Sequence, residues 1–354
     1  MEGAGKGNRS HVRAELDAVS LPVVAEGTAR GGGRMLVWLL RAVVAFVILA
    51  YLFRVVPAGR VLSELTRALV PWIVAGLALS LSVQWVVSVR LKRLAGAQGL
   101  GLSVTDALHL NLATRFYGLF VPGGTVTATA IRVYRLGQVR RQYAAAAAAV
   151  ALDRVLATMT LCAVGIVFWL LDWPPHSHGW LLLMVGALAA ISAPVALFFV
   201  LRPTPARDGS PRRLSGLAAR FDSLRNAASQ VRRMPARDLA VALALSVASH
   251  LLGIAAYAAV VAALDLHVEI SAIGWIRTAL LLATLIPVSF AGLGLREAAA
   301  LLVLPAYGID AHSSMAFSLL IFAATALGVG LVGGLFEGWR WLGGSADRNE
   351  RRVS

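Results

Sequence analysis

Six apolar runs in this sequence are each about as long as a membrane-spanning helix, and they limit the fold more than any other feature. A helix needs about 20 apolar residues to cross the hydrocarbon core of a bilayer. The backbone of an open sheet finds no hydrogen bonds in lipid, so these runs predict helices and not strands. The runs occupy residues 35–53, 69–89, 144–171, 180–201, 239–264 and 313–336. We therefore expect an all-α integral membrane protein with about six transmembrane helices.

The composition agrees with a membrane protein, and the residues present exclude several kinds of site. Of 354 residues, 58% are hydrophobic and only 14% are charged, whereas soluble domains carry about 25% charged residues. The single cysteine, Cys162, excludes an intramolecular disulfide and a cysteine-based metal site. His109 and His250 have no second metal ligand three or four residues away, and no P-loop, GxGxxG or Ser-His-Asp pattern occurs. We expect no metal and no cofactor.

The basic residues are concentrated in a few segments and indicate topology. The formal net charge is +15, with 33 Lys and Arg against 18 Asp and Glu. The basic segments are residues 1–34, 90–93, 132–141, 202–237 and 340–354. By the positive-inside rule these segments face the cytoplasm, as do both termini. No nucleic-acid reader motif accompanies the charge, so we expect membrane lipids and not nucleic acid as partners, and the cytoplasmic membrane as location.

Two further apolar segments start and end on one side of the membrane in this topology. Residues 106–139 lie between two cytoplasmic segments, and residues 272–308 lie between two outer connections. Each contains helix breakers near its middle, which are Pro122, Gly123 and Gly124 in the first and Pro287, Gly292 and Gly294 in the second. Both segments therefore predict re-entrant helical hairpins, which are tolerated where protein or a wet cavity covers the exposed backbone.

The order of spans and hairpins predicts two halves of inverted topology. The order along the chain reads span, span, hairpin, span, and then the same four elements again, and broken helices in inverted repeats are typical of transporters. The first membrane half covers residues 35–201 and the second 238–341, with a disordered cytoplasmic tail at 1–34 and another cytoplasmic tail at 342–354. The joint at 202–237 is basic and amphipathic, and predicts either a helix on the inner leaflet or an ordinary solvated linker.

Five charged residues within apolar segments need an explanation, because each costs at least ~2.5–3.5 kcal/mol at membrane depth. They are Arg115, Asp153, Arg154, Arg296 and Glu297. One interpretation is internal salt bridges, in which Asp153 pairs with Arg115 or Arg296 and Glu297 pairs with Arg154. Neighbours on a helix point about 100° apart, so we expect neither adjacent pair to bind itself. Three arginines face two carboxylates, and this surplus favours an anionic ligand such as a lipid phosphate.

Three other arginines lie near the ends of apolar segments. Arg132 follows Pro122 by ten residues, much as Arg296 follows Pro287 by nine, and this spacing makes Arg132 a sixth candidate for headgroup binding. Its alternative role is that of a plain cytoplasmic basic residue. Arg41 and Arg277 are expected to extend their side chains towards the membrane surface.

At these residues the sequence resembles the transmembrane region of lysylphosphatidylglycerol synthetases, also called the flippase-like family. The resemblance spans about residues 35–340 and is carried by LFVPGGTVTATAIRVYRLGQ (119–138), VALDRVLA (150–157) and LIPVSFAGLGLREAAALL (285–302). The family's first motif commonly continues Pro-x-Gly-x-Gly-Gly-Asp, whereas here Gly124 is followed by TVTATA. The acidic residue of the family pattern is therefore missing.

The resemblance implies movement of a phospholipid or glycolipid headgroup between leaflets. Bifunctional relatives add a soluble domain that transfers lysine from tRNA, and we expect this chain to lack it because only thirteen residues follow Trp341. The alternative function is a membrane enzyme acting on a lipid-linked phosphate or sugar, with Glu297 or Asp153 as acid or base. A third possibility is an accessory protein that transports nothing.

Overall fold

The computed structural model describes residues 56–121, 124–138, 141–172, 178–200, 234–285 and 292–339, with scattered positions between 43 and 54 and residue 229. Every regular element in these ranges is helical, which confirms the all-α class. The helices are α3 (Ala58–Arg67), α4 (Val70–Ala97), α5 (Val104–Phe120), α6 (Gly124–Gln138), α7 (Tyr143–Leu171), α8 (His178–Val200), α10 (Ala236–Ala263), α11 (Ile270–Leu285), α12 (Leu295–Val303) and α13 (Ala311–Ile321). Short turns of other helix types follow α12, as η2 (Leu304–Tyr307), and α13, as η3 (Phe322–Leu327).

Several predicted features lie outside the described residues. These are Pro122, Gly123, Pro287, both tails, Arg41 with most of the run 35–53, and nearly all of the linker 202–237.

Within the described ranges, four helices are long and apolar enough to cross a membrane. They are α4, with 28 residues, α7, with 29, α10, with 28, and the helix that starts with α13 and continues through η3 to Trp339, with 29. They correspond to the predicted runs 69–89, 144–171, 239–264 and 313–336. The fifth predicted run in the described ranges, 180–201, forms α8, whose apolar part is shorter. The protein is therefore a multi-pass helical membrane protein.

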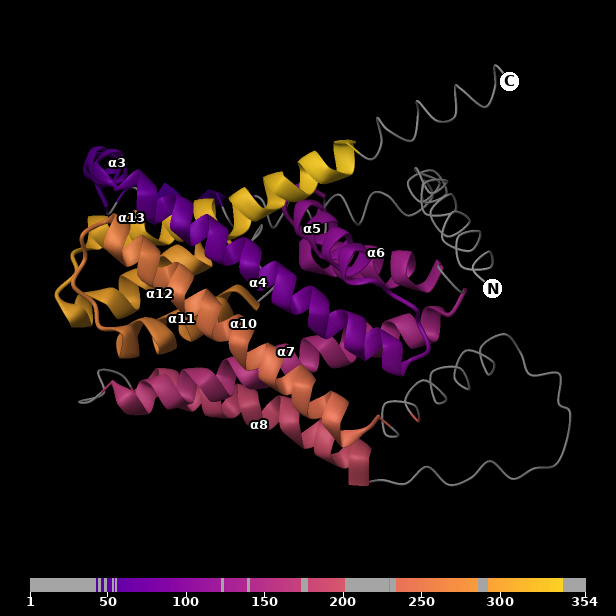
Figure 1. Cartoon of the computed structure of the whole chain (residues 1–354). Coiled ribbons are helices and arrows are strands. Elements are labelled where there is room, and N and C mark those ends of the chain that lie inside the picture. Colours follow the sequence, from indigo (N-terminus) through magenta and orange to yellow (C-terminus); the bar gives the residue numbers. More distant parts are fainter. Residues whose placement is uncertain are drawn as a thin grey trace, which may run out of the picture.

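Helices α4 and α10 form the centre of the molecule and run antiparallel (Figure 1). Gly76 near the start of α4 lies against Ala256 and Val260 of α10, while Arg90 near its end reaches Ser246. As residue numbers rise on one helix they fall on the other. This pairing places polar residues of both helices in one interface.

The two segments expected to form re-entrant hairpins contain pairs of short helices, α5 with α6 and α11 with α12. The longest of the four, α5, has 17 residues, or about 25 Å at 1.5 Å per residue, which is short of a ~30 Å hydrocarbon core. Figure 1 shows the α5–α6 pair towards the right-hand side of the molecule and the α11–α12 pair at the left. Gly292 and Gly294 in the second break have φ of 77° and 88°, which glycine adopts without strain.

Three local features differ from the expected elements. Helix α4 continues to Ala97, eight residues past the predicted end of its run, so Arg90 lies within a helix and not in a surface segment. The connection expected at 54–68 contains helix α3. The last helix widens into a π-helical turn at η3, a rare form that often marks functional positions.

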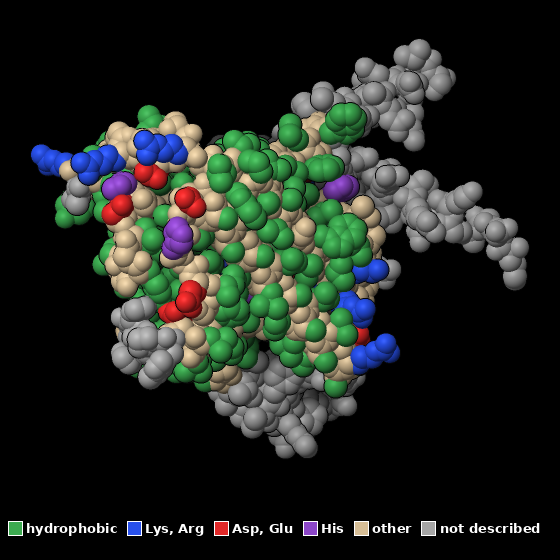
Figure 2. Space-filling view, turned by 60° about the vertical axis from the view of Figure 1, so that its left-hand side comes forward, with side chains coloured by type: hydrophobic (Ala, Val, Ile, Leu, Met, Phe, Trp, Pro, Cys, Tyr) green, Lys and Arg blue, Asp and Glu red, His purple; other side chains and the backbone are tan. Residues whose placement is uncertain are grey.

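The outer surface is apolar between two polar ends. Figure 2 shows hydrophobic side chains over most of the visible face, with charged side chains gathered towards its left and right sides. Exposed residues of this apolar surface include Trp72 and Val74 of α4 and Leu170 of α7. A surface of this kind suits lipid contact, since soluble proteins rarely expose contiguous apolar patches of this extent.

One end of the α11 helix is fixed by a small polar cluster. Trp275 Nε1 donates to Asp172 Oδ2 at 2.8 Å, and the Tyr307 hydroxyl donates to the same oxygen. Asp172 caps the end of α7 and Tyr307 belongs to η2. The cluster therefore joins three segments and holds the second helix pair against α7.

Candidate functional site

Asp153 is the centre of a buried ion-pair cluster formed by three helices. Arg90 Nε on α4 donates to Asp153 Oδ1 at 2.8 Å, and Arg132 Nη2 on α6 lies 3.1 Å from Oδ2. The three residues are only 2%, 3% and 2% exposed for Arg90, Arg132 and Asp153. Both carboxylate oxygens are therefore occupied, and Asp153 ties α7 to the first helix pair and to α4.

This pairing corrects the predicted partners of Asp153. We expected Arg115 or Arg296, but the described structure pairs neither with Asp153. The reason is that α4 is longer than predicted, so Arg90 lies within this helix and is buried beside α7. Arg132 is likewise buried, so its alternative role as a plain cytoplasmic surface residue is wrong.

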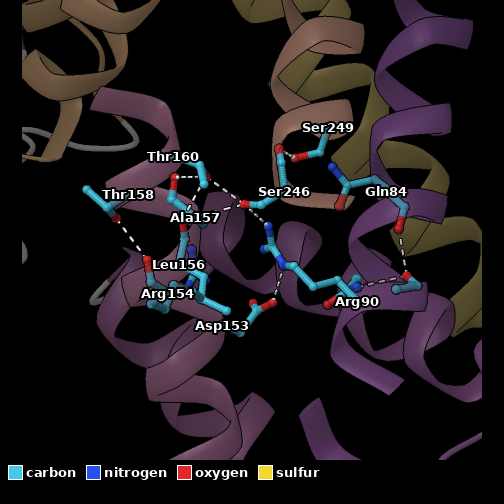
Figure 3. Close-up of polar contacts among 12 residues, drawn as sticks. Gln84, Arg90, Asp153, Arg154, Leu156, Ala157, Thr158, Thr160, Ser246 and Ser249 are labelled. Carbon is cyan, nitrogen blue, oxygen red and sulfur yellow. Dashed lines mark hydrogen bonds and ion pairs between the residues drawn. The ribbon is translucent and has the colours of Figure 1, made fainter. Parts of the chain in front are cut away.

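A chain of polar side chains continues from Arg90 across the interface (Figure 3). Arg90 Nη1 donates to Ser246 Oγ of α10 at 2.7 Å, and Ser246 Oγ lies 2.6 Å from Thr160 Oγ1 of α7. His250 Nε2 follows at 3.1 Å from Thr160 Oγ1 and 2.9 Å from the Ala157 carbonyl oxygen. Hydrogen-bonded polar groups of this kind are tolerated in an apolar interior because each has a partner.

Arg277 lies at the far end of this polar chain. Its Nη1 is 3.4 Å from His250 Nδ1, and its guanidinium lies over the Tyr257 ring at 5.7 Å from the centroid. With 8% exposure, Arg277 is buried within α11, so the expectation that it extends to the membrane surface is wrong. Helix α11 packs against α7 and α10, and the guanidinium of Arg277 contacts His250 and Tyr257 of α10.

Arg115 of α5 and Arg154 of α7 differ from the other arginines of this region. Both are exposed, and neither forms an ion pair within the described ranges of the chain. Arg115 lies within electrostatic range of Arg132, Arg154 and Arg277, whose positive charges repel its own. The first helix pair and α7 therefore present closely spaced cations with free donors.

Arg296 and Glu297 bind each other, contrary to the prediction for adjacent residues. Arg296 Nη2 donates to Glu297 Oε1 at 2.7 Å, and Ser318 Oγ of α13 lies 3.1 Å from both Arg296 Nε and Glu297 Oε1. Both side chains are long enough to bend towards the shared serine despite their different starting directions. Glu297 Oε2 accepts from the Gly294 N–H at 2.6 Å, so the pair closes the start of α12.

The predicted pair of Glu297 with Arg154 is therefore also wrong. Arg296 is 5% exposed and its guanidinium lies 4.9 Å from the Phe322 ring centroid, at the start of η3. Glu297 is fully buried. Arg296 and Glu297 neutralise each other's charge, and their hydrogen bonds to Ser318 join the second helix pair to the last helix.

The carboxylates named for the enzyme alternative both have partners on each of their oxygens. Asp153 accepts from Arg90 and lies against Arg132, while Glu297 accepts from Arg296 and from a backbone N–H. A general acid or base must reach a substrate proton within hydrogen-bond distance. Both carboxylates are buried and held by cations or backbone in the described structure, which favours a structural role for them. Among the residues that the structure describes, no three His, Cys, Asp or Glu side chains are grouped as a metal site would need.

The last helix also contacts the first helix pair through a polar cluster. Arg135 of α6 binds Glu337 in bidentate fashion, with Nη2–Oε1 at 2.6 Å and Nη1–Oε2 at 3.2 Å. The Tyr117 hydroxyl of α5 accepts from Arg135 Nη2 at 3.1 Å. One continuous helix is thus bonded to the second pair near Ser318 and to the first pair near Glu337.

Comparison with known families gives a match over most of the chain. The family model described as the lysylphosphatidylglycerol synthase TM region matches residues 38–333. The chain belongs to this family. No curated protein matches it. Membership in the lysylphosphatidylglycerol synthase TM family confirms the resemblance carried by the three motifs and makes this a lipid-related membrane protein.

The sequence did not reveal four residues of the buried polar site. The sequence places Arg90 in a basic cytoplasmic segment and Arg277 near the membrane surface, and it gives no sign of a role for Ser246 or Thr160. A signal for the first was present, because Ser80, Gln84 and Ser88 recur every four residues and mark a buried polar face on α4. A signal for Arg277 lay in Gly253, whose missing side chain gives the guanidinium its room.

Proposed function

We propose that this protein moves an anionic lipid headgroup, of a phospholipid or glycolipid, across the cytoplasmic membrane. One observation carries the proposal, namely a series of five neighbouring arginines with one carboxylate, Asp153, among them. Arg90, Arg132 and Arg154 lie within electrostatic range of Asp153, and Arg115 lies within range of Arg132, Arg154 and Arg277. Arginine does not lose its proton in proteins, so the excess positive charge needs an anion or water at membrane depth. A lipid phosphate is an anion that reaches this depth during translocation.

The six candidate residues divide into two roles in this proposal. Arg115 and Arg154 are exposed with free donors, and they contact the headgroup phosphate directly. Arg132 stands beside them with a buried Nε that has no hydrogen-bond partner, while Asp153 holds its Nη2. Guanidinium groups bind phosphate through two parallel hydrogen bonds, which suits this arrangement. Arg296 and Glu297 do not contact the headgroup in this proposal. They hold the second helix pair against the last helix through Ser318.

Alternating access through two inverted halves is the second part of the proposal. Helices α4 and α10 each have 28 residues, and the helices that follow each short pair, α7 and the helix from Ala311 to Trp339, each have 29. Equal lengths in the same order support two structural repeats of opposite orientation. The short pairs are re-entrant hairpins that enter from opposite sides, with both termini in the cytoplasm.

The first break favours an anionic headgroup over a cationic one. The TVTATA stretch that follows Gly124 contains no carboxylate, unlike the Gly-Gly-Asp that commonly stands in the resembling family pattern. An aminoacylated lipid carries extra positive charge that a carboxylate would stabilise. Here no carboxylate follows the first break to stabilise such a charge. We therefore propose an anionic phospholipid or glycolipid as substrate.

A lipid-movement assay tests this function. The full-length protein is reconstituted in liposomes that contain trace fluorescent phosphatidylglycerol, and dithionite is added to bleach the outer leaflet only. We expect bleaching to proceed beyond the outer-leaflet fraction, and to do so faster for phosphatidylglycerol than for phosphatidylcholine. Bleaching equal to that of protein-free liposomes for both lipids, and for an anionic glycolipid, would overturn the proposal.

A further inference from the structure

Arg277 is a buried cation without a carboxylate partner in the described part of the chain. It is 8% exposed, its Nε has no hydrogen-bond partner, and its guanidinium lies over the ring of Tyr257, a neutral phenol. Burying an unpaired charge costs several kcal/mol, whereas the protein's other buried arginines near it, Arg90 and Arg132, face Asp153. Arg277 therefore lacks the counter-charge that its burial demands.

The surroundings of Arg277 hold the guanidinium in one place. Its Nη1 donates to His250 Nδ1, because arginine has only donors to offer. His250 is then neutral with its proton on Nε2, which donates towards the Ala157 carbonyl oxygen at 2.9 Å. Helices α7 and α10 together orient the side chain from α11. A group fixed in this way is prepared to bind a ligand at little cost in entropy.

Gly253 of α10 makes this position possible. A Cβ atom at residue 253 would lie 2.3 Å from Arg277 Nη2, 2.6 Å from Cζ and 2.7 Å from Nε. The guanidinium plane therefore lies directly on the α10 backbone, in space that any other residue would fill. Since the glycine has an ordinary helical conformation, its role here is room for Arg277 and not backbone freedom.

We propose that Arg277 binds a phosphate-class anion, at a second position beside the one formed by Arg115 and Arg154. Arg277 stands on the second helix pair and Arg115 on the first, and the two cations lie within electrostatic range of each other. An anion between the pairs would relieve repulsion on both. The guanidinium fork, with its unbonded Nε, suits a phosphate oxygen better than a spherical halide. As a lipid site this inference rests on the proposed function, but anion binding itself does not.

Thermal unfolding of the detergent-purified, delipidated full-length protein tests the site, with Arg277→Gln as the variant. The probes are inorganic phosphate, dihexanoyl phosphatidylglycerol, dihexanoyl phosphatidylcholine and chloride at matched ionic strength. In the wild type we expect the unfolding midpoint to rise with either phosphate probe and not with chloride. Arg277→Gln should lower the apparent affinity at least about tenfold, the loss of one charge-assisted contact. In phosphate-free buffer it should be as stable as the wild type or more stable.

A purely structural role for Arg277 predicts a different result. If Arg277 has only a structural role, Arg277→Gln unfolds at a lower temperature in phosphate-free buffer and keeps the full phosphate-induced shift. Equal stabilisation by chloride would overturn the phosphate class. A response to inorganic phosphate without any response to the lipid would overturn a headgroup as its source, and the reverse result would support one.

Two further variants separate the site from folding and from transport. Gly253→Ala displaces Arg277 and should also weaken the phosphate response, whereas Gly186→Ala, at a glycine with no atom within 4 Å, should not. An Arg115→Gln/Arg154→Gln double variant should keep a phosphate-induced shift that Arg277→Gln then removes. If lipid movement is absent but this shift persists, the proposed function fails while the Arg277 site stands. If the double variant alone removes the shift, the Arg277 site fails.

Discussion

Asp153 neutralises part of the charge of two buried arginines, so its loss affects more than one contact. In Asp153→Asn, Arg90 and Arg132 would stay buried without a carboxylate. Breaking a buried pair in this way costs about 3–5 kcal/mol. We expect a clear fall in the thermal unfolding midpoint of the purified protein. Asp238→Asn, which removes the exposed partner of Arg93, is the matched control and should change little.

A second substitution shows whether unpaired positive charge causes the loss of stability in Asp153→Asn. Adding Arg132→Gln to Asp153→Asn removes one of the two orphaned cations, so the double variant should unfold at a higher temperature than Asp153→Asn alone. If the double variant loses the sum of both single effects, the residues do not interact and the cluster described here is wrong.

At the scale of residues, the sequence predicts which side chains matter better than it predicts their partners. Charge at membrane depth is visible in the sequence because it is costly, and this identified Arg115, Asp153 and Arg296. Partners depend on where helices end and how they cross. A boundary error of eight residues on α4 was enough to hide Arg90, and the length of two flexible side chains reversed the expectation for Arg296 and Glu297.

At the scale of elements, the break before α12 depends on Gly292. Its φ is 77°, and a Cβ there would lie 2.7 Å from Thr284 Cγ2 at the end of α11. Gly308 has a similar φ of 75° but no atom within 4 Å of a Cβ. Gly308→Ala should therefore show only the backbone cost of about 1–2 kcal/mol, and Gly292→Ala a larger loss of stability. Thermal or denaturant unfolding measures both losses of stability. Equal losses for the two variants would show that the close approach of Gly292 to Thr284 does not matter for stability.

The last helix meets the first helix pair through glycines. A Cβ at Gly333 would lie 2.2 Å from the backbone oxygen of Leu112 in α5, whereas one at Gly338 would meet nothing within 4 Å. Backbone cannot move aside as a side-chain end can. Gly333→Ala should push α5 away from the last helix, lower the unfolding midpoint and slow lipid movement, while Gly338→Ala should behave as the wild type. Unchanged movement in Gly333→Ala would contradict a role for this contact.

Breakers and long apolar runs predicted most elements, for a physical reason. Proline and glycine end helices locally, and length decides whether a helix crosses, so both can be read without knowing the packing. The π-helical turn Phe322–Leu327 could not be read in this way. It lies where the helix changes from packing near Arg296 to packing near α5, and that change depends on tertiary contacts alone.

At the scale of the whole molecule, similar buried polar positions support a relation between the two halves. Ser80 and Gln84 of α4 lie ten and fourteen residues after the helix start at Val70, as Ser246 and His250 of α10 do after Ala236. All four are buried. Because the helices run antiparallel, the matched pairs contribute to one polar interface at the centre of the protein. Such a centre is where transporters of inverted repeats bind their substrate.

In the proposed function, Arg115 and Arg154 bind the anionic headgroup as it crosses the membrane. The most direct measurement is the rate of dithionite bleaching of fluorescent phosphatidylglycerol in proteoliposomes, with Arg115→Gln, Arg154→Gln and the surface control Arg93→Gln reconstituted at equal density. The Arg115→Gln and Arg154→Gln variants should keep the wild-type unfolding midpoint, since neither residue forms an ion pair in the described structure. We predict that each of these two variants slows phosphatidylglycerol movement at least about tenfold, the effect of one charge-assisted phosphate contact, while Arg93→Gln moves lipid at the wild-type rate. Equal rates for all four proteins would contradict the account.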